Sequence, residues 1–227
     1  MSARALSPEG RSILSIDTSS GQGSIALYDG RRVSTRSWPA DRSHTTTLLS
    51  EIHQLLDRAE VSVRELGAIA IATGPGAFTA LRVGFGVAKG FHLATGVPLI
   101  GVPTLEATAF ALASCKSPIV AVVGAGRSRL VWARYQAGPE GLVQALAPRN
   151  GTASELAEEL NRSDPVLVTG EIDDDQAQLI DRIDGVSVPP KILRMRQPGA
   201  LAELAWRRWQ AGDIDEATTI EPVYLSR

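Results

Sequence analysis

Short apolar runs rich in β-branched residues open the chain and predict three strands, joined by hairpin turns that contain glycine. The runs are ILSIDTSS (13–20), GSIALYD (23–29) and RVSTRSW (32–38). From His44 to Ala59, apolar residues recur at spacings of three and four, which predicts a helix with Ser43 available as its N-cap. A strand over 66–73 and a helix over about 78–95 then complete the order βββαβα.

The same order of elements starts again after VPLIGV (97–102) and a helix near 104–115. A last helix over 198–212 has proline near its start and glycine at its end. Two βββαβα lobes with mixed sheets predict an α/β fold of the actin-like, ribonuclease H-like type. Between these helices we expect strands at 117–126, 129–136 and 142–147, a capped helix at 152–161, a strand at 164–170 and a short helix within 171–183.

The division into lobes is expected near 103–117, because no long linker or low-complexity tract marks another boundary. Residues 1–11 are expected to form a disordered extension. Residues 12–103 then form an N-terminal lobe, and residues 104–227 form a smaller C-terminal lobe.

Basic and acidic residues nearly cancel, 23 against 25 in 227 residues. This balance argues against a broad basic face that would hold nucleic acid by neutralising its phosphates. No apolar run approaches the roughly 20 residues of a membrane span, and residues 1–11 lack the apolar core of a signal peptide, which favours the cytoplasm. The single cysteine, Cys115, excludes an internal disulfide and a metal site built from cysteines. It lies in the apolar stretch FALASC and is expected to be a small buried residue.

Asp17 ends the first strand and is followed by a turn of small hydroxyl and glycine residues, Thr18, Ser19, Ser20 and Gly21. In actin-like ATPases such a turn wraps nucleotide phosphates, using backbone amides and a carboxylate associated with a metal. The alternative is a plain hairpin in which Asp17 bonds local amides. The motif taken alone favours this alternative.

The segment TGPGAFTALRVGFGVAKG (73–90) joins a Gly-Pro-Gly turn to a glycine-rich helix, without the GK[ST] ending of a phosphate-binding loop. Small residues repeat four apart along it, Gly84 with Ala88 and Gly86 with Gly90. Each interior glycine costs about 0.5–1 kcal/mol relative to alanine, so these positions should have a packing reason. Close packing on the parent sheet is one reason and close approach of a partner helix is the other. Apolar residues spread around much of the helix, which favours partner contact.

Two further groups of residues invite a functional interpretation. The three histidines show no metal-ligand spacing and are interpreted as surface or packing residues: His44, His53 and His92. The last predicted helix carries a short basic and aromatic cluster, Trp206, Arg207, Arg208 and Trp209. We interpret the tryptophans as anchors of the helix and the arginines as solvated, with stacking on RNA as the alternative.

Four segments together resemble the TsaB family, also called YeaZ, and the similarity spans residues 12–227. They are IDTSS (16–20), GPGAFTALRVG (74–84), VPLIGVPTLEA (97–107) and EPVYL (221–225). The resemblance implies an actin-like fold and association with TsaD, the subunit that transfers a threonylcarbamoyl group to the adenosine beside the anticodon. It also implies a TsaE ATPase in the same assembly. The near balance of basic and acidic residues indicates that any contact with tRNA is indirect.

The chain departs from its relatives at two places. TsaD carries a His-x-x-x-His metal pair at the positions of Thr104 and Thr108, and threonine cannot replace imidazole as a transition-metal ligand. TsaB members commonly read Asp-Ala-Arg where this chain reads Gly124-Ala125-Gly126. The missing carboxylate puts in doubt a nucleotide site built from acidic groups of both lobes. We expect no cofactor of the chain's own, with ATP or ADP at the junction of the complex as the remaining option.

The leading hypothesis is a non-catalytic scaffold whose N-terminal lobe binds and activates TsaD. The same surface could self-associate in a twofold arrangement, and the sequence leaves open whether a homodimer forms when TsaD is absent. The first two helices could form a four-helix bundle with an equivalent pair from another chain. One alternative is an ATPase or phosphotransferase that uses Asp17 and the adjacent turn. Another is a metallopeptidase, against which Thr104 and Thr108 argue. The expected partner surface comprises Leu48, Leu49, Ile52, Leu55, Leu56, Phe78, Leu81, Arg82 and Phe85.

Overall fold

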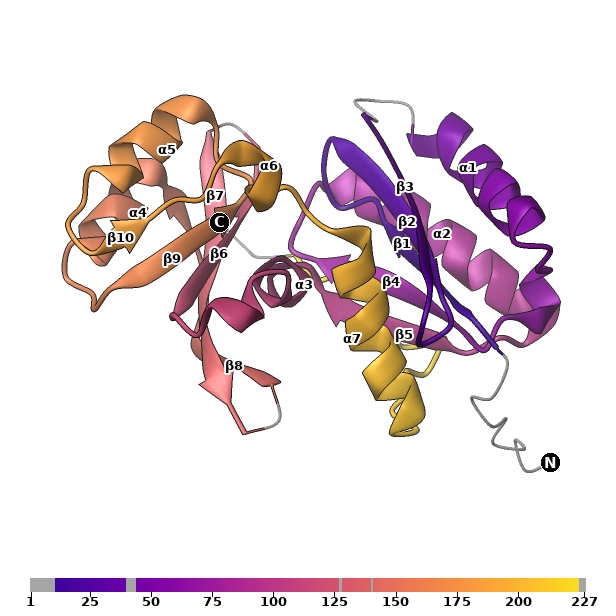
Figure 1. The fold of residues 1–227 in the computed structure, drawn as a ribbon. Coiled ribbons are helices and arrows are strands. Elements are labelled where there is room, and N and C mark those ends of the chain that lie inside the picture. Colours follow the sequence, from indigo (N-terminus) through magenta and orange to yellow (C-terminus); the bar gives the residue numbers. More distant parts are fainter. Residues whose placement is uncertain (1–10, 40–43, 127, 140, 225–227) are drawn as a thin grey trace. The chain divides into compact units, whose positions relative to one another are not determined.

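The computed structural model describes residues 11–39, 44–126, 128–139 and 141–224, which form two compact units. Each unit is built on its own five-stranded sheet (Figure 1). Residues 1–10 of the expected N-terminal extension and the expected helix cap Ser43 lie outside the described residues.

Unit 1 contains a mixed sheet with the strand order β3-β2-β1-β4-β5. β1 pairs antiparallel with β2 and parallel with β4, as the predicted βββαβ order requires. The elements are β1 (Ile13–Asp17), β2 (Gln22–Tyr28), β3 (Val33–Pro39), α1 (His44–Arg58), the 3-10 helix η1 (Val63–Glu65), β4 (Ala68–Gly74), α2 (Phe78–Thr95), β5 (Leu99–Pro103) and α7 (Pro198–Gln210).

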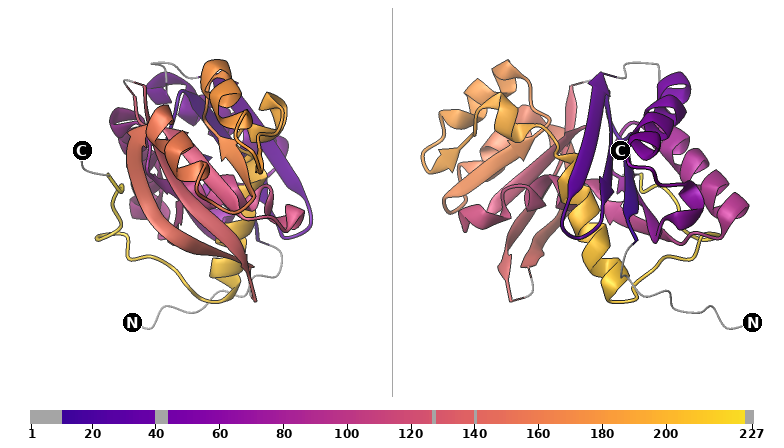
Figure 2. Two further views of the ribbon diagram at one scale, coloured as in Figure 1. Left: turned by 90° about the vertical axis from the view of Figure 1, so that its left-hand side faces the viewer. Right: turned by 45° about the vertical axis from the view of Figure 1, so that its right-hand side comes forward.

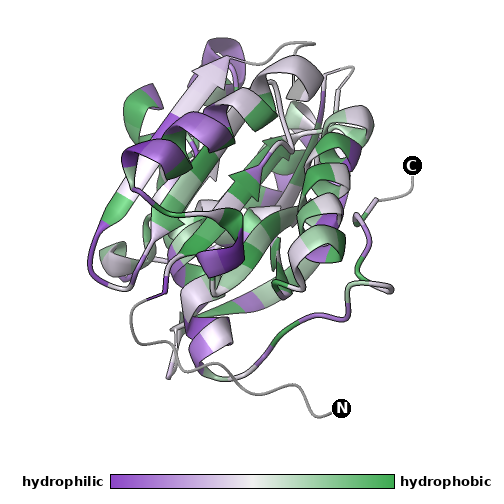
Figure 3. Cartoon of the chain, turned by 90° about the vertical axis from the view of Figure 1, so that its right-hand side faces the viewer, coloured by the Kyte–Doolittle hydropathy of each residue, from purple (hydrophilic) through white to green (hydrophobic). Residues whose placement is uncertain are grey.

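The core of unit 1 lies between its sheet and the helices α1 and α2. The central strands β1 and β4 are buried almost throughout, which fits their near-continuous apolar sequence. α1 and α2 lie side by side on one face of the sheet, and α7 covers the other face (Figures 1 and 2). In Figure 3, which looks from the side of α1 and α2, hydrophobic positions gather on the strands while the helices carry both hydrophobic and hydrophilic positions.

Unit 2 repeats the arrangement, with the strand order β8-β7-β6-β9-β10. Thr152 caps α4 in a reciprocal capping box with Glu155, as the sequence predicts. In the left view of Figure 2, this unit faces the viewer. The elements are α3 (Thr104–Phe110), the 3-10 helix η2 (Ala113–Cys115), β6 (Ile119–Gly124), β7 (Arg129–Gly138), β8 (Gly141–Thr152), α4 (Ala153–Leu160), β9 (Val166–Gly170), α5 (Asp174–Asp181), β10 (Val186–Ser187) and α6 (Lys191–Arg194).

The expected C-terminal boundary is wrong, because residues 198–223 belong to unit 1. α7 docks there through its tryptophans, which fill spaces that only glycine leaves open. A Cβ at Gly30 would lie 2.6 Å from the Trp206 ring, and a Cβ at Gly67 would lie 2.1 Å from the Trp209 ring. The apolar side of α7 thus covers the second face of the first sheet, which would otherwise be exposed.

Several element boundaries also differ from expectation. The third strand of the second unit extends over 141–152, and η1, β10 and α6 were not expected at all. The helix expected near 104–115 ends at Phe110 and is followed by η2. Cys115 ends η2 and is exposed, so its expected burial is wrong. The chain turns away at the next residue, Lys116, which has a left-handed conformation. The duplicated βββαβα order and the two mixed sheets are confirmed, and the fold is α/β of the actin-like, ribonuclease H-like type.

Candidate functional site: the β1–β2 turn and the outer face of α2

The turn after β1 is closed by the carboxylate of Asp17. One carboxylate oxygen accepts hydrogen bonds from the backbone N–H of Ser19 at 2.9 Å and from its hydroxyl at 2.6 Å. This is the local bonding of a hairpin in which an aspartate organises its own turn. Asp17, Thr18 and Ser19 are buried, whereas Gly21 is exposed. The structure therefore brings the predicted turn residues together, and a contact with nucleotide phosphates stays a prediction.

Thr18 connects this turn to the first turns of α2. Its hydroxyl donates to the carbonyl of Ala80 at 2.7 Å. A Cβ at Gly84 would lie 2.5 Å from that hydroxyl oxygen and 3.0 Å from the Cδ1 of Ile71. Gly84 is therefore explained by close packing of α2 on its parent sheet. Ala88, one turn further on, is also fully buried.

The opposite side of α2 faces solvent within unit 1. We define the outer face of α2 as Phe78, Arg82, Gly86, Gly90 and Leu93, which follow one another at helical spacings of four or three. A Cβ at Gly86 or Gly90 would meet nothing within 4 Å. Phe78 is 50% exposed, and the Arg82 guanidinium lies 4.0 Å from the centroid of its ring. The repeated small residues thus point both into the unit and out of it.

Most residues of the expected partner surface are not accessible to a partner. Six of its nine residues are buried in the core of unit 1, and only Leu49, Phe78 and Arg82 are exposed. Apolar spacing reports a buried face, and on α1 and α2 that face is turned to the unit's own sheet. Leu81→Asp or Phe85→Asp would place an unpaired charge in this core, so we expect either substitution to destabilise unit 1. The six buried residues are Leu48, Ile52, Leu55, Leu56, Leu81 and Phe85.

Thr104 and Thr108, which the resemblance aligns with the metal-binding histidines of TsaD, lie on α3. Both are buried, and the Thr108 hydroxyl donates to the Thr104 carbonyl at 2.8 Å. Within the described ranges, no group of three or more His, Cys, Asp or Glu side chains is placed to hold a metal ion. His53 is exposed on α1, and the Nδ1 of His92 lies 2.9 Å from the Val97 carbonyl oxygen. The side chain of His44 is outside the described part of the chain.

A carboxylate that the sequence did not reveal lies beside Gly124. The Gly124 N–H donates to the Glu171 carboxylate at 3.0 Å, and a Cβ at Gly124 would lie 3.5 Å from the same oxygen. Arg196 pairs with Glu171 at 2.9 Å. A negative charge therefore stands next to the position where TsaB members commonly carry aspartate. Glu171 follows β9 and is 47 residues from Gly124 in sequence, so no local pattern predicts the contact.

The basic and aromatic cluster on α7 serves its packing. Trp206 and Trp209 are buried, which confirms the anchoring interpretation. Arg207 pairs with Glu203 at 2.8 Å, and Arg208 pairs with the carboxylates of Asp213 and Asp215 at 2.6 and 3.3 Å.

Glu203 on α7 also bonds to β2 through Tyr28. A hydrogen bond with Glu203, aided by burial, raises the pKa of Tyr28 to about 12. This contact joins α7 to the sheet by a polar link in addition to the tryptophans.

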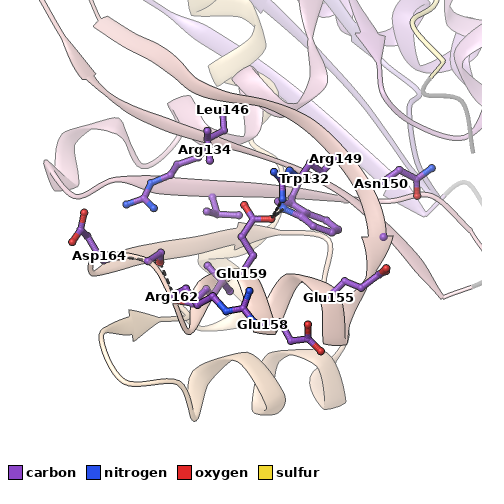
Figure 4. Close-up of a pocket in the computed structure, with 14 residues that line it drawn as sticks. Trp132, Arg134, Leu146, Arg149, Asn150, Glu155, Glu158, Glu159, Arg162 and Asp164 are labelled. Carbon is purple, nitrogen blue, oxygen red and sulfur yellow. Dashed lines mark hydrogen bonds and ion pairs between the residues drawn. The ribbon is translucent and has the colours of Figure 1, made fainter.

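Unit 2 has a groove of about 810 Å³ between α4 and the strands β7 and β8 (Figure 4). In its wall, the Glu159 carboxylate accepts from the Trp132 indole at 3.2 Å and from Arg149 at 3.1 Å. Arginines and carboxylates both line the groove, so it does not select one sign of charge. Among the residues that the structure describes, no helix is both long and apolar enough to cross a membrane.

Comparison with known proteins identifies relatives in one group. The family model of TsaD, described as tRNA N6-adenosine threonylcarbamoyltransferase, matches residues 39–166. The Escherichia coli tRNA threonylcarbamoyladenosine biosynthesis protein TsaB is 32% identical over 132 residues, which are 57% of each chain. YeaZ from Pseudomonas aeruginosa superposes with a TM-score of 0.78 at 26% identity, covering 95% of this chain and 100% of that one. A crystal structure of an uncharacterised protein with similarity to peptidase YeaZ gives 0.79 at 25% identity, with the same coverage.

The similarity in sequence to the curated relatives is partial, since the chain spans less than two thirds of the length of the Escherichia coli protein it matches. The structural similarity to YeaZ nevertheless extends over both units. The family model covers more than half of the chain, including α1, α2 and the strands β4 to β8. The chain therefore belongs to the family that the TsaD model describes, and within it to TsaB, also called YeaZ.

Proposed function

We propose that the chain is a non-catalytic subunit of the assembly that makes threonylcarbamoyladenosine in tRNA, where it binds and activates TsaD. Membership of the TsaB family supports the process, because the Escherichia coli relative is described as a protein of threonylcarbamoyladenosine biosynthesis. The TsaE ATPase is a further member of the proposed assembly. The near balance of 23 basic and 25 acidic residues favours indirect contact with tRNA, through the partner.

Two local features support a role without catalysis. The positions of the TsaD histidines hold Thr104 and Thr108, whose side chains are buried and cannot serve as imidazole ligands. The Asp17 carboxylate accepts hydrogen bonds from the backbone N–H and the hydroxyl of Ser19, which gives this side chain a structural role in closing the turn. ATP turnover by the purified chain that disappears in Asp17→Ala would favour the phosphotransferase alternative.

The observation that carries the proposal is the outer face of α2. Its exposed aromatic ring and stacked guanidinium, Phe78 and Arg82, are residue types that are enriched at protein interfaces. Beyond them, Gly86 and Gly90 leave the helix backbone open to close approach. Leu49 adds an exposed apolar side chain on the neighbouring helix α1. We propose that this surface docks on TsaD, and that it forms a twofold homodimer when TsaD is absent.

A matched pair of substitutions tests this assignment. Phe78 and Val143 are apolar side chains with nearly equal exposure, 50% and 48%, and they lie on different units. Phe78→Asp is expected to weaken binding to the TsaD of the same organism by about tenfold or more, because a charge would be buried at the interface. Val143→Asp is expected to leave the affinity unchanged. Calorimetric titration measures both, and retention of wild-type affinity by Phe78→Asp would remove α2 from the interface.

A further inference from the structure

The segment that follows α7 runs back along the sheet of unit 1. We call residues 213–223 the strap. Near its start, the Asp215 N–H donates to the Leu99 carbonyl at 2.9 Å, and the Asp215 carboxylate accepts from the Gly101 N–H at 2.7 Å. These bonds cover the edge strand β5. Further along, Ile220 is buried in the core of the unit.

The strap ends on the last residues of β4, just before the turn that leads to α2. The Val223 N–H donates to the Thr73 carbonyl at 2.7 Å. This bond places the segment EPVYL beside Thr73, the residue immediately before the segment GPGAFTALRVG, and both segments carry the family resemblance. The side chain of Val223 is 49% exposed, so the backbone hydrogen bond, more than apolar burial, holds this residue in place.

Gly74 lies between the strap and the first turns of α2. Its φ of +105° is a conformation that side chains disfavour. A Cβ there would lie 2.7 Å from the Val223 carbonyl oxygen on one side and 3.2 Å from the Cδ1 of Leu81 on the other. The strap packs against Gly74, and Gly74 packs against Leu81, so the three form one continuous series of contacts. Leu81 is fully buried and lies in the same turns of α2 as Phe78 and Arg82.

We propose that the strap is a positioning element for the outer face of α2, and that docking of Val223 on Thr73 holds Phe78 and Arg82 in the orientation that binds the partner. The inference rests on the proposed function for the identity of that partner. Because binding and docking are linked, a partner on the outer face of α2 stabilises the docked strap by the same factor by which the strap raises its affinity.

Substitution of Val223 separates the backbone bond from the side chain. Val223→Pro removes the N–H donor, and Val223→Ala keeps it. Hydrogen exchange of the full chain, read by mass spectrometry over residues 74–85, is expected to be about fivefold faster or more in Val223→Pro and unchanged in Val223→Ala. In Gly74→Ala the added methyl group would clash with the Val223 carbonyl oxygen, so this variant is expected to show the same increase in the exchange rate of residues 74–85. Unchanged exchange in both Val223→Pro and Gly74→Ala would overturn the proposal.

A double-mutant cycle on TsaD affinity distinguishes positioning from a general loss of stability. Val223→Pro is expected to weaken binding about fivefold or more in the wild-type background and to have little further effect beside Phe78→Ala, because both changes act on one contact. Equal losses in the two backgrounds would overturn the coupling. If wild-type chain does not bind TsaD at all, the proposed function fails, and the exchange experiment alone decides whether the strap positions α2.

Discussion

Single residues on α2 show how one sequence pattern serves two purposes. The repeat of small residues at 84, 86, 88 and 90 predicts close approach of something to the helix, and the sequence does not say of what. Apolar residues surround the helix, so hydrophobic periodicity does not separate its faces. The structure separates them, because a Cβ at Gly84 meets Thr18 and a Cβ at Gly86 meets nothing within 4 Å.

Alanine substitutions at these two glycines should have opposite effects on stability. Gly84→Ala is expected to lower the free energy of unfolding by about 1–3 kcal/mol, because its methyl group overpacks the contact with Thr18. Gly86→Ala is expected to raise it by about 0.5–1 kcal/mol, since alanine favours the helix and the space is open. Urea denaturation of the two variants measures both. A stabilised Gly84→Ala would show that α2 does not pack on the β1–β2 turn as described.

At the scale of elements, the order of strands and helices could be predicted, and the docking of α7 could not. Period-two and period-3.6 patterns are local, so they mark β1 and α1 well. Where a helix docks depends on a tertiary match, here between Trp209 and Gly67, which are 142 residues apart by their numbering. The same limit explains why most residues of the expected interface are buried in the core of unit 1. On α1, periodicity identified the buried side of the helix and could not say that the sheet of the same unit covers it.

The link between β2 and α7 predicts a dependence of stability on alkaline pH. The pKa of Tyr28 is raised from 10.0 to about 12, so the folded state holds this proton more tightly than the unfolded state. The contribution of Tyr28 is therefore fully present below pH 10 and is lost as the pH rises from 10 towards 12. The difference in urea midpoint between wild type and Tyr28→Phe should be constant below pH 10 and shrink above it. A difference that persists unchanged above pH 10 would show that Glu203 does not hold the phenol.

At the scale of the whole molecule, unit 1 is discontinuous in sequence, since residues 198–223 return to it after unit 2. A fragment of residues 1–102 lacks α7 and the strap, so one face of its sheet and the edge of β5 are uncovered. We expect this fragment to aggregate or to unfold without cooperativity. Joining residues 198–227 to it through a long Gly/Ser linker should restore a single cooperative urea transition. Residues 103–197 provide the matched control fragment. They contain the whole sheet of unit 2, so this fragment is expected to unfold cooperatively without any added segment.

We propose that TsaD requires this chain, and that the chain performs no catalysis itself. The most direct measurement is threonylcarbamoyl transfer to tRNA by the TsaD of the same organism, with TsaE and the enzyme that forms the threonylcarbamoyl-adenylate donor, in the presence and absence of the chain. We predict that transfer requires the chain, that Val143→Asp supports it as wild type does, and that Phe78→Asp needs about tenfold or more of the chain to support the same rate. Full transfer without the chain, or no complex between the chain and TsaD, would contradict the account.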